Sequence, residues 1–399
     1  MSGGTARPLR IALVAGPVRE DRDGVAGYVL RLARELTGAG AVVRLVHTGA
    51  TPAGVRGVSV GRRWSPVALL RARRALAGAD VVSVQFAPSM YGFRAWVGLL
   101  PLAAGRRPIV PTLHEYGWWT WARQVPRTAW RALEPRRLVD RETALLVPRA
   151  ARVVVTNAAH AEDVRRRFPD LPVVAIPIGA NVAVATSEPA EVLRPSVRVE
   201  LGVAPDAVLL AFFGFVHPVK GIRYLGEAVA RLAAEGRDVH LLVVGGFEST
   251  ALPAAEALAF EAELRAHLAA AGAGDRARIT GFLPEEAASR LLAAADVAVL
   301  PFTAGVTTKS GSLLTVLAHG LPTVVTAAPE PDPELVDGAT CVVVPAVRDA
   351  PALADGIRRV LDDPALATRI AAAGRALAAR RDWPDIAARH LALLAEVAR

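Results

Sequence analysis

The stretch AFFGFVHPVKG (residues 211–221) shows how this chain folds. A run of apolar, β-forming residues ends at Gly214, and Lys220 follows in the loop before the next predicted helix. Short apolar runs that alternate with helices are typical of a parallel sheet covered on both faces. The stretch therefore predicts one strand–loop–helix unit of an α/β domain.

A second stretch of the same kind, KSGSLLTVLAHGLPTVV (residues 309–325), lies further along the chain. A helix N-terminus exposes unpaired N–H groups and the positive end of the helix dipole, and a lysine adds a full charge. Two such termini, one beside Lys220 and one beside Lys309, predict a site for a diphosphate. A diphosphate site indicates a nucleotide-activated substrate.

The chain has 399 residues, which is long for one core and predicts two domains. Its single cysteine, Cys341, lies in a β-branched run and is expected to be a buried apolar residue, which argues against disulfides and a Cys-ligated metal. The opening residues MSGGTARPLR show no leader pattern, and no apolar stretch approaches the ~20 residues that span a bilayer. We therefore expect a cytoplasmic protein.

The positive charge is concentrated in residues 61–170, which contain 19 Arg and no Lys against 8 acidic residues, while the whole chain has a net charge of +9. One interpretation is a set of Arg-rich helix surfaces. Another is binding to an acidic acceptor or peripheral contact with anionic lipid at the inner face of the membrane. Nucleic acid is not expected as a partner, because no base-reading motif accompanies the charge.

Apolar runs predict strands in both halves of the chain. Those of the first half are RIALVA (10–15), AVVRLVH (41–47), VVSVQF (81–86), PIVPTLH (108–114), RVVVT (152–156) and PVVAIP (172–177). Those of the second half are VLLAFFG (208–214), HLLVVGG (240–246), RITGF (278–282), VAVLPF (297–302), TVVT (323–326) and CVVVP (341–345). The polar, Pro-containing residues 184–203 predict a linker between an N-terminal domain (1–183) and a C-terminal domain that begins at 204. Two doubly wound, Rossmann-like domains bind ligands at the carboxyl ends of their strands, across a cleft.

The loop after the first strand, GPVREDRDGVAGYV (residues 16–29), is long and polar, and Gly24 opens its helix. Such a loop can bring backbone N–H groups to a phosphate or a sugar, although a plain turn is the alternative. It does not match the dinucleotide fingerprint G-x-G-x-x-G. The one Asp-x-Asp spelling, residues 21–23, lies well past its strand, so we expect no metal site and no cofactor.

The polar pair His114-Glu115 closes a predicted strand and suits contact with substrate hydroxyls. Five of the seven Trp residues fall between positions 96 and 130. Indole rings stack on sugar faces, although core packing explains some of them. The residues expected to bind the acceptor are Glu115, Tyr116, Trp118, Trp119 and Trp121.

Lys220 is the strongest phosphate-binding candidate, because it follows a strand and a Gly turn and precedes a helix. His217 lies in the same loop. Hydroxyl residues before the second helix can contact a ligand or merely cap that helix. The residues expected to bind the donor are Gly24, Phe215, His217, Gly245, Gly246, Thr307, Thr308, Lys309, Ser310, Gly311, Ser312 and Thr315.

These motifs, in this order, resemble the retaining, nucleotide-sugar-dependent glycosyltransferases of family 4, a glycogen synthase/mannosyltransferase-like group with the two-domain GT-B fold. The resemblance covers nearly the whole chain. It includes DGVAGYV, TLHE, VTN with IPIGAN, FFGFVHPVKG, LLVVGG, the block ITGFLPEEAASRLLAAADVAVLPF, AHGLPTVV and the last helix, DWPDIAARHLALL.

The resemblance implies transfer of a sugar from a nucleotide-diphosphate donor with retention of configuration. The aromatic, Arg-rich N-terminal half could serve a saccharide, lipid-linked or small-molecule acceptor. It implies that His114 touches the donor sugar, that Gly24 lies near the sugar phosphate and that Lys220 holds the diphosphate. The last helix, residues 384–399, would return to the N-terminal domain, so the donor domain would be residues 204–383.

The chain departs from the family at three positions. The family's paired Glu positions hold Thr307 and Thr315, and Phe215 replaces a common Arg. A non-catalytic nucleotide-sugar-binding protein therefore stays open as an alternative, as does an epimerase or phosphorylase on the same fold.

Overall fold

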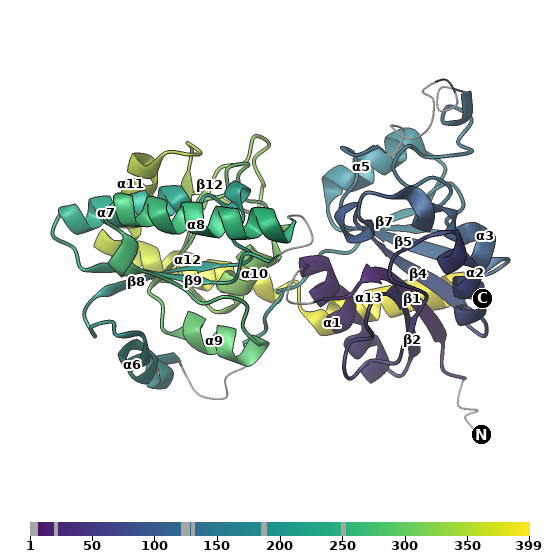
Figure 1. Ribbon diagram of the computed structural model, residues 1–399, viewed down its shortest axis with the longest axis horizontal. Helices are drawn as coiled ribbons and strands as arrows, with labels where there is room; N and C mark the ends of the chain where they lie inside the picture. The colour runs from purple at the N-terminus through teal and green to yellow at the C-terminus, as the bar shows by residue number, and fades with distance from the viewer. Residues whose placement is uncertain (1–6, 20–22, 121–127, 129–131, 185–189, 249–252) are drawn as a thin grey trace. The chain divides into compact units, whose positions relative to one another are not determined.

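The computed structural model describes residues 7–19, 23–120, 128, 132–184, 190–248 and 253–399. The chain divides into two compact units, one formed by Met1–Ile178 with Trp383–Arg399 and the other by Gly179–Asp382. Each unit contains a parallel sheet with helices packed against it (Figure 1). This confirms the prediction of two doubly wound α/β domains.

The sheet of the first unit has the strand order β3-β2-β1-β4-β5-β6-β7, and all described pairs are parallel. The order reverses between β1 and β4, which marks the switch point where doubly wound domains bind ligands. The short β3 was not predicted, because Gly-Val-Ser is too short to give an apolar run. The strands are β1 (Arg10–Pro17), β2 (Val42–Thr48), β3 (Gly57–Ser59), β4 (Val81–Phe86), β5 (Ile109–Leu113), β6 (Val153–Val155) and β7 (Val173–Ala175).

The helices of the first unit include one from the far end of the sequence. The described helices are α1 (Gly24–Gly38), α2 (Pro66–Ala75), α3 (Leu100–Ala104), α5 (Ala158–Arg167) and α13 (Trp383–Val397). Helix α1 begins where Asp23 accepts a hydrogen bond from Val25 N at 2.8 Å, which caps its first turn. Helix α13 packs beside α1 (Figure 1), so the C-terminal helix completes this unit.

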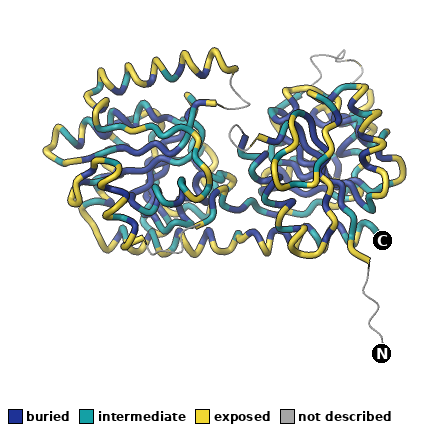
Figure 2. Tube along the Cα trace, turned by 60° about the horizontal axis from the view of Figure 1, so that its bottom comes forward, coloured by how far each residue is buried: buried dark blue, intermediate teal, exposed yellow. Residues whose placement is uncertain are grey.

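The sheet of the second unit has the order β10-β9-β8-β11-β12-β13, and its switch point lies between β8 and β11. Figure 2 shows a dark, buried interior, and the strands of this sheet consist mostly of buried residues. Their apolar runs are continuous rather than alternating, because both faces of a parallel sheet are covered. The strands are β8 (Val208–Phe213), β9 (Val239–Val244), β10 (Ala277–Ile279), β11 (Val297–Leu300), β12 (Thr323–Thr326) and β13 (Val342–Val344).

Helices α7 and α8 lie on one side of this sheet and α9 on the other (Figure 1). Helix α7 also packs against α11, and α10 packs against α12. The helices are α6 (Ala190–Leu201), α7 (Ile222–Ala234), α8 (Ala254–Ala270), α9 (Glu285–Ala293), α10 (Gly311–Ala318), α11 (Ala350–Asp362) and α12 (Pro364–Ala379).

Helix α6 lies inside the segment that was predicted as a linker. Pro195 interrupts its sequence pattern, yet Leu193 and Val197, one turn apart, are both buried, and the helix packs on α9. Tertiary packing thus outweighs a residue that disfavours helix.

Candidate active site

The switch point of the second sheet brings together the loops that follow β8 and β11. Val219 O accepts a hydrogen bond from Thr303 N at 2.9 Å. Gly221 has φ +69°, and a Cβ there would lie 2.0 Å from Pro301 O. The two loops therefore pack backbone to backbone, and only glycine fits at Gly221.

Lys220 lies in this pair of loops, at the end of the short 3₁₀ helix η4 (Pro218–Lys220). Its Nζ is 3.6 Å from the centroid of the Phe302 ring, a cation–π contact across the switch point. Desolvation by burial lowers the pKa of Lys220 to about 8. A bound anion would favour the charged form and raise this pKa, so the site suits a phosphate.

Helix α10 begins beside the same loops. Ser310 caps it by accepting a hydrogen bond from Leu313 N at 3.3 Å. A Cβ on Gly214 would lie 2.5 Å from Ser312 Oγ, so the first turn of α10 packs on the residue that follows β8. The predicted residues Ser310, Gly311 and Ser312 thus lie near the end of β8, while Lys309 is exposed.

Two hydroxyl residues of the predicted set are engaged within the protein. Thr308 donates both its N–H and its hydroxyl to Asp332 Oδ2, at 2.7 and 2.8 Å. Thr307 is half-buried, and its carbonyl accepts a hydrogen bond from Ser310 N at 3.0 Å. The Asp332 contact fixes the loop before α10.

Thr315 is a correction to the predicted donor site. It is fully buried, and its hydroxyl accepts hydrogen bonds from Asn181 N at 3.1 Å and Val182 N at 3.3 Å. The Thr315 hydroxyl therefore anchors Asn181 and Val182 to α10. Its helical position alone did not reveal this burial.

Four further predicted donor residues lie in the loops after β8 and β9. His217 caps η4 through Nδ1, and desolvation together with the Lys220 charge lowers its pKa. Phe215 is half-buried. A Cβ on Gly245 would lie 1.9 Å from Gly214 O, so chain packing explains this glycine, and Gly246 O accepts a hydrogen bond from Val216 N at 2.9 Å.

In the first unit, His114 directly follows β5. Its Nε2 is 3.0 Å from Gln85 Oε1. The Gln85 amide nitrogen donates to the hydroxyls of Ser83 and Thr112. The amide oxygen of Gln85 therefore faces the ring and accepts a hydrogen bond from the Nε2–H of His114. Nδ1 of His114 is then the acceptor nitrogen.

The surroundings of His114 keep its ring neutral. Desolvation by burial lowers its pKa to about 3, with smaller contributions from His390 and His160. Tyr28 packs edge-on against it, with ring centroids 4.7 Å apart, and donates to or accepts from His390 Nε2 at 2.9 Å. At neutral pH His114 can exchange hydrogen bonds with a sugar hydroxyl but supplies no charge.

Tyr116 is a second correction. It is 2% exposed, its hydroxyl donates to Asp140 at 2.9 Å, and Arg167 lies 4.7 Å from its ring centroid. It therefore belongs to the interior rather than to an acceptor surface. Gly24, the first residue of α1, and Glu115, two residues after the end of β5, are half-buried.

Trp118 lies at the surface, and Trp119 is partly buried against the core of the first unit. Trp118 is 62% exposed and contacts Phe93 edge-on, with centroids 6.4 Å apart, and Trp119 lies 6.2 Å from the same ring. We call Phe93, Trp118 and Trp119 the aromatic surface. Trp121, also predicted for acceptor binding, lies outside the described residues.

The sequence interpretation missed several residues that shape these sites. Phe302, Gln85 and Asp332 each contact a predicted residue, but each comes from a distant segment. The one sequence signal that could have pointed to such residues is a position at the end of a strand. Phe302, after β11, and Gln85, near the end of β4, have this position, but Asp332 does not. The buried carboxylates Asp140 and Glu142 had no local signal.

No group of three or more His, Cys, Asp or Glu side chains in the described ranges could hold a metal ion. Metal independence stays a prediction. Among the helices of the described chain, none has the length and apolar character needed to cross a membrane. A concavity of about 550 Å³ in the first unit, lined by Gly49, Ala50, Ser59, Gly61, Arg62 and Arg71, contains no predicted site residue.

Two Rossmann-like domains of this kind define the GT-B class, and solved structures of that class match nearly the whole chain. Sucrose-phosphate synthase from Thermosynechococcus elongatus matches with 21% identity and a TM-score of 0.71, covering 98% of this chain and 99% of that one. HepE from Anabaena, in complex with UDP and glucose, matches with 16% identity and a TM-score of 0.73, covering 97% and 100%.

Both halves also match glycosyltransferase families. Residues 22–184 match the family described as Glycosyltransferase Family 4, and residues 207–363 match Glycosyl transferases group 1. Together the two matches span most of the chain, and both are to glycosyltransferase families.

Curated relatives match part of the chain. An alpha-D-kanosaminyltransferase of Streptomyces kanamyceticus is 28% identical over 62% of this chain and 63% of its own length. A 2-deoxystreptamine glucosyltransferase of the same organism is 32% identical over 48% and 46%, and a D-inositol 3-phosphate glycosyltransferase of Nocardioides sp. is 30% identical over 50% and 43%. The matched region thus spans just under two thirds of the first relative and less than half of the other two.

Proposed function

We propose that this protein transfers a sugar from a nucleotide-diphosphate sugar to a hydroxyl group of a small, ring-shaped acceptor, with retention of anomeric configuration. The observation that carries the proposal is the arrangement at the switch point of the second sheet. There, the partly desolvated Lys220 ammonium and the first turn of α10 both lie at the end of β8.

This arrangement suits a leaving diphosphate. As the bond to the sugar breaks, negative charge grows on the diphosphate, and preorganised donors stabilise it by about 3–4 kcal/mol for one well-placed group. Lys220 supplies a full charge, and the N-terminus of α10 supplies backbone N–H groups. With this charge stabilisation the reaction is proposed to proceed without a metal.

Retention is proposed to follow from attack on the same side as the leaving group, so no protein nucleophile is needed. Neutral His114 would hydrogen-bond a hydroxyl of the donor sugar through Nδ1, because Gln85 occupies Nε2. Its low pKa is consistent with such a contact, since protonation would remove the acceptor.

The acceptor class is supported by the relatives and by the aromatic surface. Two of the curated relatives are named for 2-deoxystreptamine and D-inositol 3-phosphate, which are polyhydroxylated rings. Exposed Trp118 offers an indole face, and such rings stack on the apolar faces of sugars and cyclitols. We therefore place the acceptor at the aromatic surface.

A second candidate function is nucleotide-sugar binding without transfer. It is favoured by Thr307 and Thr315, which stand at the family's two Glu positions. Neither threonine carries the charge that a Glu at its position would bring to the donor.

The deciding experiment incubates the protein with UDP-glucose and, in turn, 2-deoxystreptamine, D-inositol 3-phosphate or D-glucose, with and without EDTA. Released UDP reports turnover, and NMR of the product reports its anomeric configuration. Lys220→Ala should lower turnover at least 100-fold, the size of effect expected for one charge-stabilising donor. Arg237→Ala, which removes an exposed partner of Asp362, is the matched control and should leave turnover unchanged.

Acceptor-dependent turnover that survives EDTA and retains configuration would support the proposal. Binding of UDP-glucose without UDP release in any mixture would favour the second function instead. Turnover unaffected by Lys220→Ala would contradict the proposed role of that residue.

A further inference from the structure

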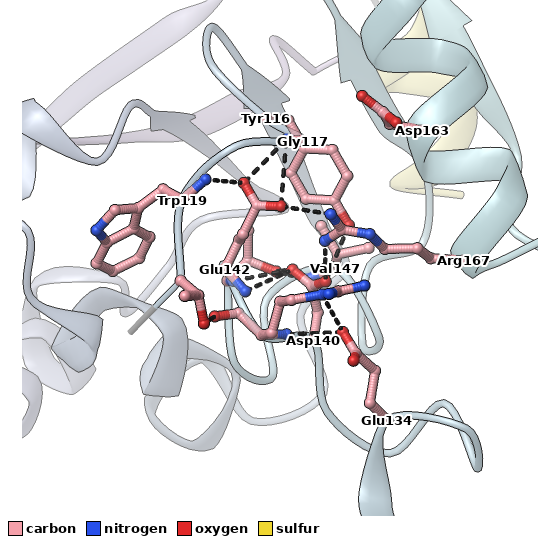
Figure 3. Close-up of polar contacts among 12 residues, drawn as sticks. Tyr116, Gly117, Trp119, Glu134, Asp140, Glu142, Val147, Asp163 and Arg167 are labelled. Carbon is pink, nitrogen blue, oxygen red and sulfur yellow. Dashed lines mark hydrogen bonds and ion pairs between the residues drawn. The ribbon is translucent and has the colours of Figure 1, made fainter. Parts of the chain in front are cut away.

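The carboxylate of Glu142 is buried beneath the loop that carries Trp118 and Trp119. Its side chain is 0% exposed. Glu142 Oε2 accepts hydrogen bonds from Gly117 N at 2.9 Å and from Trp119 N at 3.4 Å (Figure 3). One carboxylate oxygen thus fixes the backbone on both sides of Trp118.

A guanidinium group holds this carboxylate in place. Arg167, at the end of α5, contacts Glu142 Oε1 at 2.7 Å and Asp140 Oδ1 at 3.1 Å (Figure 3). Asp140 is also fully buried and accepts hydrogen bonds from the N–H and hydroxyl of Thr143, at 2.9 and 2.7 Å. A buried pair of this kind is strongly destabilised when one partner is removed, so the geometry is tightly specified.

The segment that Glu142 binds, Gly117 to Trp119, has no space for a side chain at its first residue. Gly117 has φ +102°, and a Cβ there would lie 2.3 Å from Asp163 Oδ2. The loop therefore passes between the Asp163 side chain on one side and Glu142 on the other. The backbone path of this loop determines the direction in which the indole of Trp118 points.

The aromatic surface depends on that path. Phe93, which contacts both Trp rings, is 42% exposed and has φ +54°. Left-handed backbone is strained for a phenylalanine, and strain of this kind persists only where surrounding contacts maintain it. The described contacts of Phe93 with Trp118 and Trp119 link its position to the segment that Glu142 holds.

We propose that Glu142, held by Arg167, is a positioning residue for the acceptor, because it sets the geometry of the aromatic surface on which a sugar or cyclitol ring stacks. This inference rests on the proposed function. Glu142 does not touch the acceptor. Its effect is exerted through the N–H groups of Gly117 and Trp119, and it concerns acceptor affinity rather than the donor.

The test compares Glu142→Gln with Trp118→Ala, using UDP-glucose and whichever of the three acceptors named above gives turnover. Both variants should raise the acceptor KM at least 10-fold and leave the calorimetric Kd for UDP within 2-fold. Glu134→Gln is the matched control, because Glu134 pairs with Arg141 near the surface and contacts neither Gly117 nor Trp119. It should change neither value.

A double variant separates positioning from a general structural role. If Glu142 acts through Trp118, the acceptor KM of Glu142→Gln/Trp118→Ala should match the larger single effect rather than the product of the two. Multiplying effects, or an unchanged KM in either single variant, would overturn the inference. If Glu142→Gln does not fold, Arg167→Lys replaces it in the same cycle.

The outcomes distinguish the inference from the function beneath it. A wild-type protein that turns over none of the acceptors contradicts the proposed function, and the inference falls with it. If the wild type is active and Trp118→Ala has the same acceptor KM, the aromatic surface does not bind the acceptor. The inference is then refuted, but the proposed transferase activity is not.

Discussion

The ammonium of Lys220 lies 3.6 Å from the centre of the Phe302 ring, and the two residues come from loops on opposite sides of the switch point in the second sheet. The ring face stabilises the cation while excluding water from it. Burial lowers the pKa of Lys220 to about 8, so this lysine begins to lose its charge near physiological pH.

The first prediction concerns the pH dependence of donor binding. A diphosphate favours the charged lysine and raises its pKa, so binding takes up a proton wherever free Lys220 is neutral. The affinity for UDP-glucose should be constant below about pH 7 and should fall above pH 8, by up to about tenfold per pH unit. Calorimetry between pH 6 and 9.5 measures this slope.

Lys220→Arg is the control for that experiment, because arginine stays charged throughout the range. Its binding should show no slope above pH 8. A slope that persists in this variant would assign the titration to another group.

The second prediction concerns Gln85, which holds Nε2 of His114. Gln85→Glu would place a carboxylate beside the ring and raise the pKa of His114 from about 3 towards neutrality. Turnover should then fall as the pH drops through the new pKa, since the protonated ring has lost its acceptor at Nδ1. The turnover of the wild type should show no such fall between pH 5 and 8.

NMR titration of the His114 ring, alongside pH–rate profiles, checks this result. The Tyr28 ring and the Gln85 amide contact the His114 ring, and His160 and His390 contribute to lowering its pKa. Gln85→Met, which removes the hydrogen bond without adding charge, should lower turnover without a new pH limb. Identical profiles for the Glu and Met variants would refute the role given to Gln85.

The third prediction concerns Thr315, whose hydroxyl accepts hydrogen bonds from Asn181 N and Val182 N. Thr315→Val keeps the shape but removes the acceptor of the part-buried Asn181 N–H and the buried Val182 N–H, which should destabilise the protein by roughly 1–3 kcal/mol. Thr315→Ser retains the acceptor and should be much milder. Urea midpoints compare the two, and equal midpoints would show that the hydrogen bonds contribute little.

The strands and the Lys220 loop could be predicted from sequence because their signals are local. An apolar run such as Val81–Phe86 appears directly as β4, and Lys220 follows its strand and glycine within a few residues. The parallel sheet then requires the ends of β8 and β11 to meet. The local pattern predicted Lys220 directly after a strand, as the structure has it, while the donor site itself stays a proposal.

Burial of single polar side chains could not be predicted in this way. Tyr116 looks like a member of an exposed aromatic run, but its interior position depends on Asp140 and Arg167, which lie far along the chain. Thr315 looks like a ligand-facing helix residue, but it binds the segment that follows Ile178. In both cases the partner, rather than the residue type, decides the role.

The fourth prediction concerns Gly245, which allows β9 to end against the loop that carries Phe215 and Lys220. It has φ +153°, and a Cβ would lie 1.9 Å from the carbonyl oxygen of Gly214. That oxygen belongs to the backbone and cannot swing away, so Gly245→Ala must displace the loop after β8. We expect a loss of roughly 2–4 kcal/mol in stability, together with weaker binding of UDP-glucose.

Gly27→Ala is the comparison, because Gly27 lies within α1 with no atom within 4 Å of an added Cβ. Alanine there should stabilise the helix by roughly 0.5–1 kcal/mol. Denaturation midpoints that move in opposite directions are the expected result, whereas a Gly245→Ala protein with unchanged stability and donor affinity would show that the two loops adjust independently.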